Sequence, residues 1–312
     1  MPERPLPTIW RTKLRSTLEG VDHTEQVEHC LKKKLIGIGW GPPDLPTGSS
    51  LEKVTQFIES CDLDGWTKNG AHTVRRFGEQ ARRNDFVWTR HTNGKYMLCK
   101  ITGPYKFDNS KAAKAADVHQ TRKVAWALEE LNDLDVPGGV VRSFIGTGSS
   151  FSRVHDPATI KLTPYLWAKL NQEPLPDLEL TPEDVLQRVL DPYDVEDLIY
   201  MWLQVERGYI ALPRTQQKST PAYEWTMVHR KNGNKGIVQV KTGDDKVDLA
   251  ALRNARSDEE TETFAFATSG IRPGDDVSLV DEIIEPNDLL KFVKNHRKLL
   301  PGRLKTWFEL AG

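Results

Sequence analysis

Several features are scarce or missing in this 312-residue sequence, and each absence removes a class of protein. Cysteine occurs only at Cys30, Cys61 and Cys99, which are too few and too far apart to indicate a disulfide framework or a zinc site. No apolar run approaches the length of a membrane-spanning helix, and the N-terminal residues lack the apolar core of a secretion signal. We therefore expect a cytoplasmic protein without a membrane partner.

Net charge is also nearly absent, at −1, so the chain as a whole is not a basic nucleic-acid binder. The distribution of charge is more informative. Residues Arg75–Lys123 contain twelve Lys/Arg and four Asp/Glu, whereas Glu173–Glu206 contain ten Asp/Glu and a single basic residue, Arg188. The first of these regions suits a phosphate backbone, although a basic run is most often a solvated surface.

The length of the chain allows two domains, and its 38% hydrophobic and 28% charged residues are typical of globular proteins. Residues 153–180 contain four prolines and no clear hydrophobic period, which is typical of a linker. We place the boundary there, and expect domains at residues 1–172 and 173–312.

The stretch that organises the second domain, residues 219–246, has the pattern of a β-hairpin. Residues 223–230 and 236–242 are rich in aromatic and β-branched side chains, and Asn232-Gly233 lies between them. Because Asn-Gly between strand-like runs is the strongest short-range hairpin signal, we expect a two-residue turn at this pair.

A two-residue turn would place Glu224 opposite Lys241 and Thr226 opposite Gln239. Since side chains alternate faces along a strand, these four residues share one face. The other face is apolar and suited to burial, and it carries Tyr223, Trp225, Met227, Val238 and Val240.

A carboxylate, an amide and a lysine on one face are groups that phosphodiester hydrolysis can use. Gln-x-Lys on the second strand, fifteen residues after the acid, resembles the catalytic core of PD-(D/E)xK nucleases. The phrase IVQVKTG is similar to Mrr-like restriction endonucleases, in which Gln replaces the second acid. The alternative is an ordinary cross-strand Glu–Lys pair.

The resemblance implies roles for these side chains. Glu224 and the Gln239 carbonyl oxygen would bind Mg²⁺ or Mn²⁺, and Lys241 would orient the attacking water. An acid on the preceding helix would join the metal site, with Glu196 as the first choice and Asp197 as the second. Glu224 departs from the Asp that is more frequent at its position, so activity is less firmly implied than fold.

The elements expected around the hairpin also resemble this core. They are a helix from Asp191 to about Arg207, a strand at residues 209–215, the hairpin, a helix at 248–254 and a strand at 261–268. Terminal helices follow at residues 286–296 and 301–310. The order of helix, three strands, helix and strand implies a mixed sheet flanked by helices.

The first domain consists of short strand-like segments separated by turns, which predicts a small β-barrel. The segments are residues 8–14, 35–39, 85–90, 96–102, 119–126, 140–145 and 151–154. The phrases IGIGWG, DFVWTRHTNGKYMLCKITGPYKF, HQTRKVAW and VPGGVVRSFIG resemble the EVE/PUA-like fold, over about residues 5–160. That resemblance implies nucleic-acid binding, in several such domains by holding a flipped, often modified base in an aromatic pocket.

A flipped base needs flat walls and a few hydrogen bonds. The candidate walls are Trp66, Trp40 and Trp88, with the first two favoured because they lie in loop or strand-end contexts beside glycine. Most aromatic side chains of a small barrel are simply core. The candidate phosphate contacts are Arg90, Lys100, Lys106, Arg122 and Lys123.

Together these features predict an α/β (α+β) protein in which an EVE/PUA-like reader directs an Mrr-like nuclease. The expected activity is Mg²⁺-dependent cleavage of DNA that carries modified bases, as in modification-dependent restriction of foreign DNA. Cleavage of both strands would be served by a homodimer. The alternative is a non-cleaving reader of modified DNA or RNA that retains a degenerate nuclease-like domain.

Overall fold

The computed structural model of the chain describes residues 7–16, 20–61, 67–145, 149–176, 180–212, 222–243 and 245–312. The chain divides into two compact units, Met1–Asp177 and Leu178–Gly312, here called unit 1 and unit 2. The boundary predicted after residue 172 lies inside unit 1, just beyond helix α6 (Pro157–Leu170). Both divisions therefore separate the same helices and strands.

Unit 1 contains a six-stranded mixed sheet with the order β2-β5-β4-β3-β1-β6. Strands β1 and β3 are parallel, and the other neighbours are antiparallel. The strands are β1 (Ile9–Thr12), β2 (Leu35–Ile38), β3 (Phe86–Arg90), β4 (Tyr96–Phe107), β5 (Gln120–Trp126) and β6 (Phe151–Arg153).

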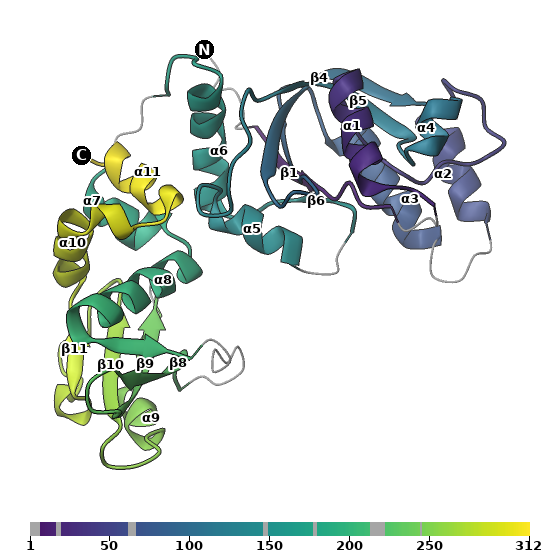
Figure 1. Cartoon of the computed structure of the whole chain (residues 1–312). Coiled ribbons are helices and arrows are strands. Elements are labelled where there is room, and N and C mark those ends of the chain that lie inside the picture. The colour runs from purple at the N-terminus through teal and green to yellow at the C-terminus, as the bar shows by residue number, and fades with distance from the viewer. Residues whose placement is uncertain are drawn as a thin grey trace. The chain divides into compact units, whose positions relative to one another are not determined.

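The sheet is open in the part of the chain that the structure describes, instead of closing into the expected barrel (Figure 1). Residues 140–145, expected as a strand, belong to helix α5 (Gly138–Ile145). The helix starts where Val140 N donates to Pro137 O at 2.9 Å. Gly139 allows a close approach to α6, because a Cβ there would lie 2.6 Å from Thr159 Oγ1. With this segment helical, β2 and β6 remain the two outer strands.

Helices cover both faces of the unit 1 sheet (Figure 1). One face forms a shared core with α1 (His23–Lys33), α2 (Leu51–Ser60) and α3 (Thr67–Arg75). On the other face α6 packs on β3, where the Trp88 indole N–H donates to Thr163 Oγ1 at 3.1 Å. A short helix, α4 (Lys111–Ala115), precedes β5. Side chains of β3 point alternately to the two faces of the sheet, and both sets are buried because helices cover both faces.

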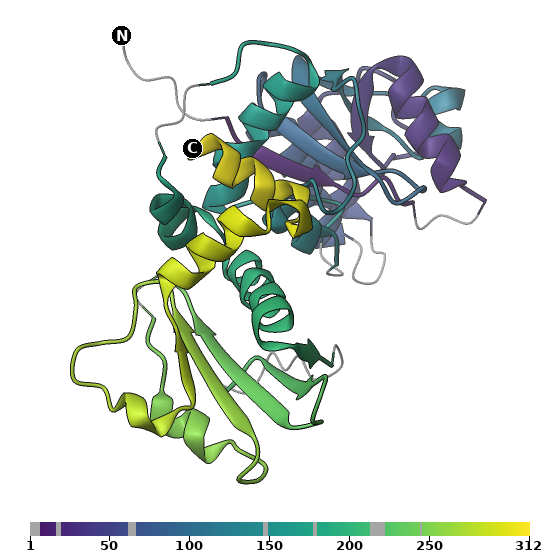
Figure 2. The same ribbon diagram turned by 60° about the vertical axis from the view of Figure 1, so that its left-hand side comes forward.

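Unit 2 is built on a five-stranded mixed sheet with the order β11-β10-β9-β8-β7, visible in Figure 2. Strands β7, β8 and β9 are successively antiparallel, while β10 is parallel to β9 and to β11. The strands are β7 (Tyr209–Ala211), β8 (Trp225–His229), β9 (Lys235–Lys241), β10 (Glu262–Ala267) and β11 (Glu282–Ile284).

The helices of unit 2 are α7 (Pro182–Asp184), α8 (Pro192–Trp202), α9 (Leu249–Asn254), α10 (Pro286–Asn295) and α11 (Gly302–Leu310). A π-helical turn, Leu203–Arg207, extends α8 and ends at Gly208, whose φ of 75° suits glycine. From α8 to β10 the order is helix, three strands, helix and strand, as expected, with β11 added. Among the described helices, none combines the length and apolarity needed to cross a membrane.

The β8–β9 hairpin forms, but the predicted register is wrong by two residues. The observed pairs include Trp225 with Val238 and Val228 with Lys235. A four-residue loop replaces the two-residue turn, because His229 N donates to Asn234 O at 2.8 Å across residues 230–233. A shift of two residues keeps Trp225, Met227 and Val238 on their predicted face. Tyr223, predicted on that same face, instead packs against the cluster that contains Ile237 and Ala265.

The side chain of Asn232 explains this longer loop. Its Oδ1 accepts from Asn234 N at 3.1 Å and lies 2.7 Å from His229 Nδ1. Gly233 takes the left-handed backbone conformation, with φ of 76°. Asn232 thus organises the loop through its side chain and does not occupy the first position of a tight turn.

Candidate active site

The structure brings Glu224 and Lys241 together on one face of the β8–β9 hairpin. Lys241 Nζ lies 3.8 Å from Glu224 Oε1, and the two side chains are 26% and 21% exposed. Glu224 N donates to Val238 O at 2.7 Å, which continues the ladder one residue before β8. The paired register ends at Trp225 and Val238, one residue before Glu224 and Gln239. The contact of Glu224 with Lys241 thus forms despite the change of register.

Gln239 is the most deeply buried of the predicted site residues, with no exposed surface. Its Oε1 accepts a hydrogen bond from Asp248 N at 2.8 Å, at the start of α9. On β10 its neighbour is Ala265, whose small side chain leaves room for the amide beside it. The Gln239 oxygen thus fixes the entry to α9.

Burial raises the pKa of the Glu224 carboxyl above its usual value, while the positive charge of Lys241 and the N–H of Val240 oppose that rise. Removal of the ammonium would leave a half-buried carboxylate with less compensation. A nearby cation or phosphate-bound metal would favour the ionised form in the same way.

The helix acids lie in different surroundings. Asp197 Oδ2 accepts from Arg303 Nη2 at 2.7 Å, so the second-choice acid is held in an ion pair with α11. Glu196 is half-buried on α8. The ring of Tyr200, on the same helix, has its centre 6.3 Å from that of Trp225. The assignment of Glu196 to the metal site stays a prediction.

The candidate donors are one carboxylate, from Glu224, and one amide oxygen, from Gln239. Mg²⁺ commonly keeps several waters and takes one or two protein carboxylates together with substrate phosphates. This donor set fits a weakly held Mg²⁺ of that kind. Among the described residues no three His, Cys, Asp or Glu side chains group as a metal site, so water and phosphate oxygens would complete the coordination.

The three candidate base-stacking tryptophans differ in their surroundings. Trp66 lies outside the described residues. Trp88 is fully buried between β3 and α6, which favours a structural role. Trp40 is half-buried, and its ring packs so closely on α3 that a Cβ at Gly70 would lie 2.5 Å from it.

Trp40 also has an unusual backbone, with φ of 68°. It follows Gly39, where a Cβ would lie 2.6 Å from the Asp117 carboxylate, and its own carbonyl accepts from Gln120 Nε2 at 2.8 Å. Residues held in such a conformation cluster at ligand sites, although they occur elsewhere too. Among the described tryptophans Trp40 is the one that best keeps the predicted base contact open.

Of the five candidate phosphate contacts, Arg122 is unsuited to the role. It is 6% exposed, and its guanidinium donates to the carbonyl oxygens of Phe77, Gly78 and Gly103 at 3.1, 2.8 and 3.3 Å. Those donors cannot also reach a phosphate. Arg122 instead ties the chain near the end of α3 to the sheet.

The other candidates remain accessible to different degrees. Lys106 and Lys123 are exposed, and Lys123 Nζ donates to Lys33 O at 2.8 Å. Lys100 is half-buried against the Phe86 and Trp167 rings. Arg90 is exposed at the end of β3.

Arg90 lines a pocket together with Lys13 and Arg15, two cations that the sequence analysis did not single out. The basic stretch that the sequence indicates, Arg75–Lys123, lies far along the chain from residues 11–15. The signal that could have found them is the alternation of basic residues in Arg-Thr-Lys-Leu-Arg at positions 11–15.

Comparisons with known proteins add one finding. A family described as a domain of unknown function (DUF8426) matches residues 10–137. No curated protein and no solved structure matches the chain. The family match lies within unit 1, from β1 to the residue before α5, and covers less than half of the chain.

Proposed function

We propose that the chain is a metal-dependent endonuclease that cuts DNA carrying modified bases, with the catalytic residues in unit 2 and nucleic-acid binding in unit 1. The observation that carries the proposal is the contact of Glu224 with Lys241, which follows the buried Gln239 by two residues on β9. Lys241 Nζ and Glu224 Oε1 are 3.8 Å apart, a contact longer than an ordinary charge-assisted hydrogen bond, so a phosphodiester or a metal can compete with it.

The surrounding topology supports the same reaction class. Strand β9 ends at Lys241, and β10 runs parallel to it and ends at Ala267. Lys241 O accepts from Thr268 N at 3.0 Å, and Gly243 N donates to Thr268 Oγ1 at 2.9 Å. These bonds fix the carboxyl ends of the parallel strands, the region where α/β sheets commonly place ligands.

The chemistry assigned to the site is hydrolysis of one phosphodiester bond. A water oxygen forms a bond with phosphorus, one P–O ester bond breaks, and the leaving oxygen takes up a proton. Lys241 stabilises the charge that develops on the phosphate oxygens and orients the water. Glu224 and the Gln239 oxygen would hold Mg²⁺, which supplies Lewis-acid stabilisation when bound.

The reader role of unit 1 rests on its charge and on Trp40. Residues Arg75–Lys123 are strongly basic, and all belong to unit 1. The half-buried Trp40 offers an aromatic surface beside the polar side chains of Asp117 and Gln120. This role does not depend on a closed barrel.

The test is nicking of supercoiled plasmid by the full-length protein. Plasmids with and without modified cytosines or adenines are incubated with and without Mg²⁺. The proposal expects nicking of modified DNA that requires Mg²⁺. Absence of nicking on every modified substrate, with a protein that melts cooperatively, would overturn it.

A second candidate function is favoured by one specific observation. Gln239 is fully buried and already accepts from Asp248 N, and this hydrogen bond would be expected of a structural amide. The chain would then be a non-cleaving reader of modified DNA or RNA. Mobility shifts of modified DNA or RNA without strand breaks at any metal concentration would favour this function over the first.

A further inference from the structure

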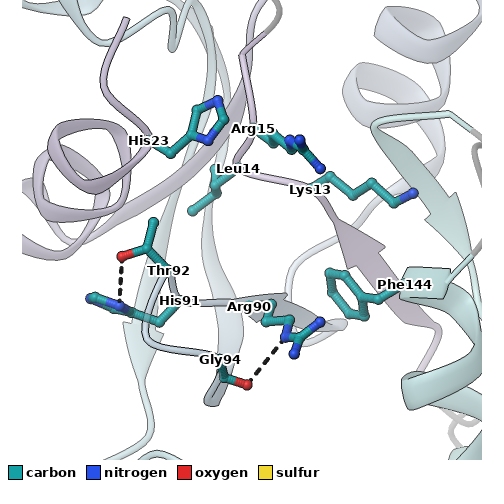
Figure 3. Close-up of a pocket in the computed structure, with 9 residues that line it drawn as sticks. All are labelled: Lys13, Leu14, Arg15, His23, Arg90, His91, Thr92, Gly94 and Phe144. Carbon is teal, nitrogen blue, oxygen red and sulfur yellow. Dashed lines mark hydrogen bonds between the residues drawn. The ribbon is translucent and has the colours of Figure 1, made fainter.

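A pocket in unit 1, here called the Arg90 pocket, is lined by cations from separate parts of the chain. Its volume is about 470 Å³, within the range of small-molecule sites. Figure 3 shows the side chains arranged around it. The lining residues are Lys13, Leu14, Arg15, His23, Arg90, His91, Thr92, Gly94 and Phe144.

The charge of this lining is of one sign. Lys13, Arg15 and Arg90 are cations, and none of the described residues that line the pocket is acidic. Two carboxylates close to residues of the lining are not part of it. Glu28 Oε1 is 4.0 Å from His91 Nε2, and Asp22 caps α1 by accepting from Thr24 N.

Burial lowers the pKa of Lys13, and the neighbouring charges of Arg11 and Arg15 lower it further. The positive groups therefore destabilise one another, and an anion placed among them would relieve that repulsion. A larger pocket of about 990 Å³ in the same unit also has basic residues, but Glu79 and Asp85 are part of its lining. Anion binding is favoured in the smaller pocket.

The Arg90 side chain is oriented before any ligand binds. Its Nε donates to Gly94 O at 3.1 Å, and its guanidinium carbon lies 5.3 Å from the centre of the Tyr96 ring. These contacts leave the terminal nitrogens as the donors that a ligand can use. A guanidinium held in this way loses less conformational entropy on binding a phosphate than a freely rotating one.

The β3–β4 turn that carries Gly94 is itself well determined. His91 N donates to Lys95 O at 2.8 Å, and Lys95 N donates to Asn93 Oδ1 at 2.9 Å. Gly94 has φ of 88°, which other residues adopt only with strain. The wall that holds Arg90 is therefore fixed by the turn.

Phe144 gives the pocket an aromatic wall near the end of α5. The ring packs edge to face on Tyr96 at 5.5 Å, and the Arg11 guanidinium lies 5.6 Å from its centre. Part of the ring still lines the pocket. An aromatic wall beside phosphate-binding cations is the combination that recognises a base together with its phosphate.

We infer that the Arg90 pocket binds one nucleoside phosphate unit, with the phosphate held by Arg15, Arg90 and Lys13 and the base packed against Phe144. The unit can belong to a free nucleotide or to a single-stranded nucleic acid, since both present the same chemistry. The pocket belongs to unit 1 and the Glu224–Lys241 pair to unit 2. Nucleotide binding can therefore be tested whether or not the protein cleaves DNA.

The experiment is calorimetric titration of the full-length protein with dTMP, dAMP, thymidine and inorganic phosphate. We expect either nucleotide to bind at least tenfold more tightly than thymidine or phosphate alone. Arg15→Ala should weaken nucleotide binding about tenfold, because a phosphate contact is lost. Lys111→Ala, the matched control on α4, removes the same charge from an exposed residue outside the pocket and should change binding little.

Phe144→Leu keeps an apolar side chain and removes the ring. It should weaken nucleotide binding about fivefold or more while leaving phosphate binding unchanged. Melting temperatures of all variants, compared with wild type, identify any that are misfolded. If Phe144→Leu lowers nucleotide and phosphate binding equally, the base contact is refuted.

A single-stranded oligothymidylate of about ten nucleotides distinguishes the two sources of the ligand. Tighter binding than dTMP with a steeper salt dependence assigns the pocket to a strand, and equal binding assigns it to a free nucleotide. Either result supports the inference. Failure of wild type to bind either nucleotide or the oligonucleotide below about 1 mM, or equal losses in Arg15→Ala and Lys111→Ala, would overturn it.

Discussion

Two acid–base clusters in unit 2 use similar groups in different surroundings. Arg303 lies between Asp194 and Asp197, donating to them at 2.5 and 2.7 Å, and its side chain is 10% exposed. Glu224 and Lys241 are 3.8 Å apart, more exposed than Arg303 and Asp194 but less exposed than Asp197. Arg303 is held by two short hydrogen bonds, whereas Lys241 and Glu224 are joined by a longer contact.

The length of the contacts and the burial of the basic residue distinguish a structural cluster from a candidate site better than residue type does. All these acids lie in or near the elements of the proposed nuclease core, and Asp197 was a candidate metal ligand by position alone. Its ion pair with Arg303 joins α8 to α11. The four predictions below test the contrast, from the largest expected effect to the smallest.

Removing the basic partner of the buried cluster should have the largest effect, and it should act on folding. Arg303→Ala leaves Asp194 buried without its guanidinium, which typically costs about 3–5 kcal/mol of unfolding free energy. Denaturant unfolding of the two proteins measures the difference. A loss of less than about 1 kcal/mol would mean that the cluster is not a structural tie.

Removing the basic partner of the open pair should act on cleavage instead. Lys241→Ala should lower the nicking rate by about 100-fold or more, because the charge that develops on the phosphate loses its stabilising ammonium. Lys241→Arg should also fail, since a planar guanidinium does not replace a compact ammonium. Lys235→Ala, on the same face of β9, is the control and should nick DNA at the wild-type rate. Equal rates for Lys241→Ala and Lys235→Ala would exclude Lys241 from catalysis.

The buried cluster should also make stability depend on pH. Burial and the charge of Asp191 raise the pKa of Asp194 to about 7, against the opposing effect of Arg303. A raised folded-state pKa means that the folded protein binds more protons than the unfolded chain between about pH 4 and pH 7. The contribution of Asp194 to the free energy of unfolding is therefore most favourable near the lower end of this pH range and falls as the pH rises towards 7.

The expected loss is on the order of 2 kcal/mol between about pH 5 and pH 7. Asp194→Asn keeps an oxygen for Arg303 and removes the titration, so its stability should vary less over that range. Melting curves of the two proteins at several pH values measure this. Parallel pH profiles would show that Asp194 does not titrate differently on folding.

The smallest effect is expected at Gln239, the uncharged candidate metal ligand. Gln239→Glu adds a carboxylate beside Glu224, which should lower the Mg²⁺ concentration for half-maximal nicking about tenfold, or about 1.4 kcal/mol. A purely structural Gln239 predicts the reverse, with lower melting temperature and an unchanged Mg²⁺ requirement. Measuring both quantities on one preparation decides between these roles.

Period-two alternation predicted that Glu224 and Lys241 lie close together, and their charged groups are 3.8 Å apart. It placed Tyr223 on the wrong face. It could not set the pairing of the two strands, because the loop length depends on how the Asn232 side chain bonds to Asn234 and His229. The order of elements from α8 to β10 followed from caps, prolines and strand-like runs. These are local signals, which sequence patterns carry well.

The features that the sequence did not reveal all depend on tertiary contacts. Residues 140–145 are apolar enough for a strand, yet they belong to helix α5, which starts at Gly138. Arg122 lies in a basic stretch but is buried on backbone carbonyls. Lys13 and Arg15 meet Arg90 only in the folded chain, and their separation in sequence hides that pocket.

The central claim is that Glu224 and Lys241 act as one catalytic unit. Its most direct test is a double-mutant cycle on Mg²⁺-dependent nicking of modified plasmid, with Glu224→Gln, Lys241→Ala and both together. Groups that act as a unit are strongly non-additive, so the double variant should be about as slow as either single variant. Additive losses, or nicking that is unchanged in either single variant, would contradict the claim.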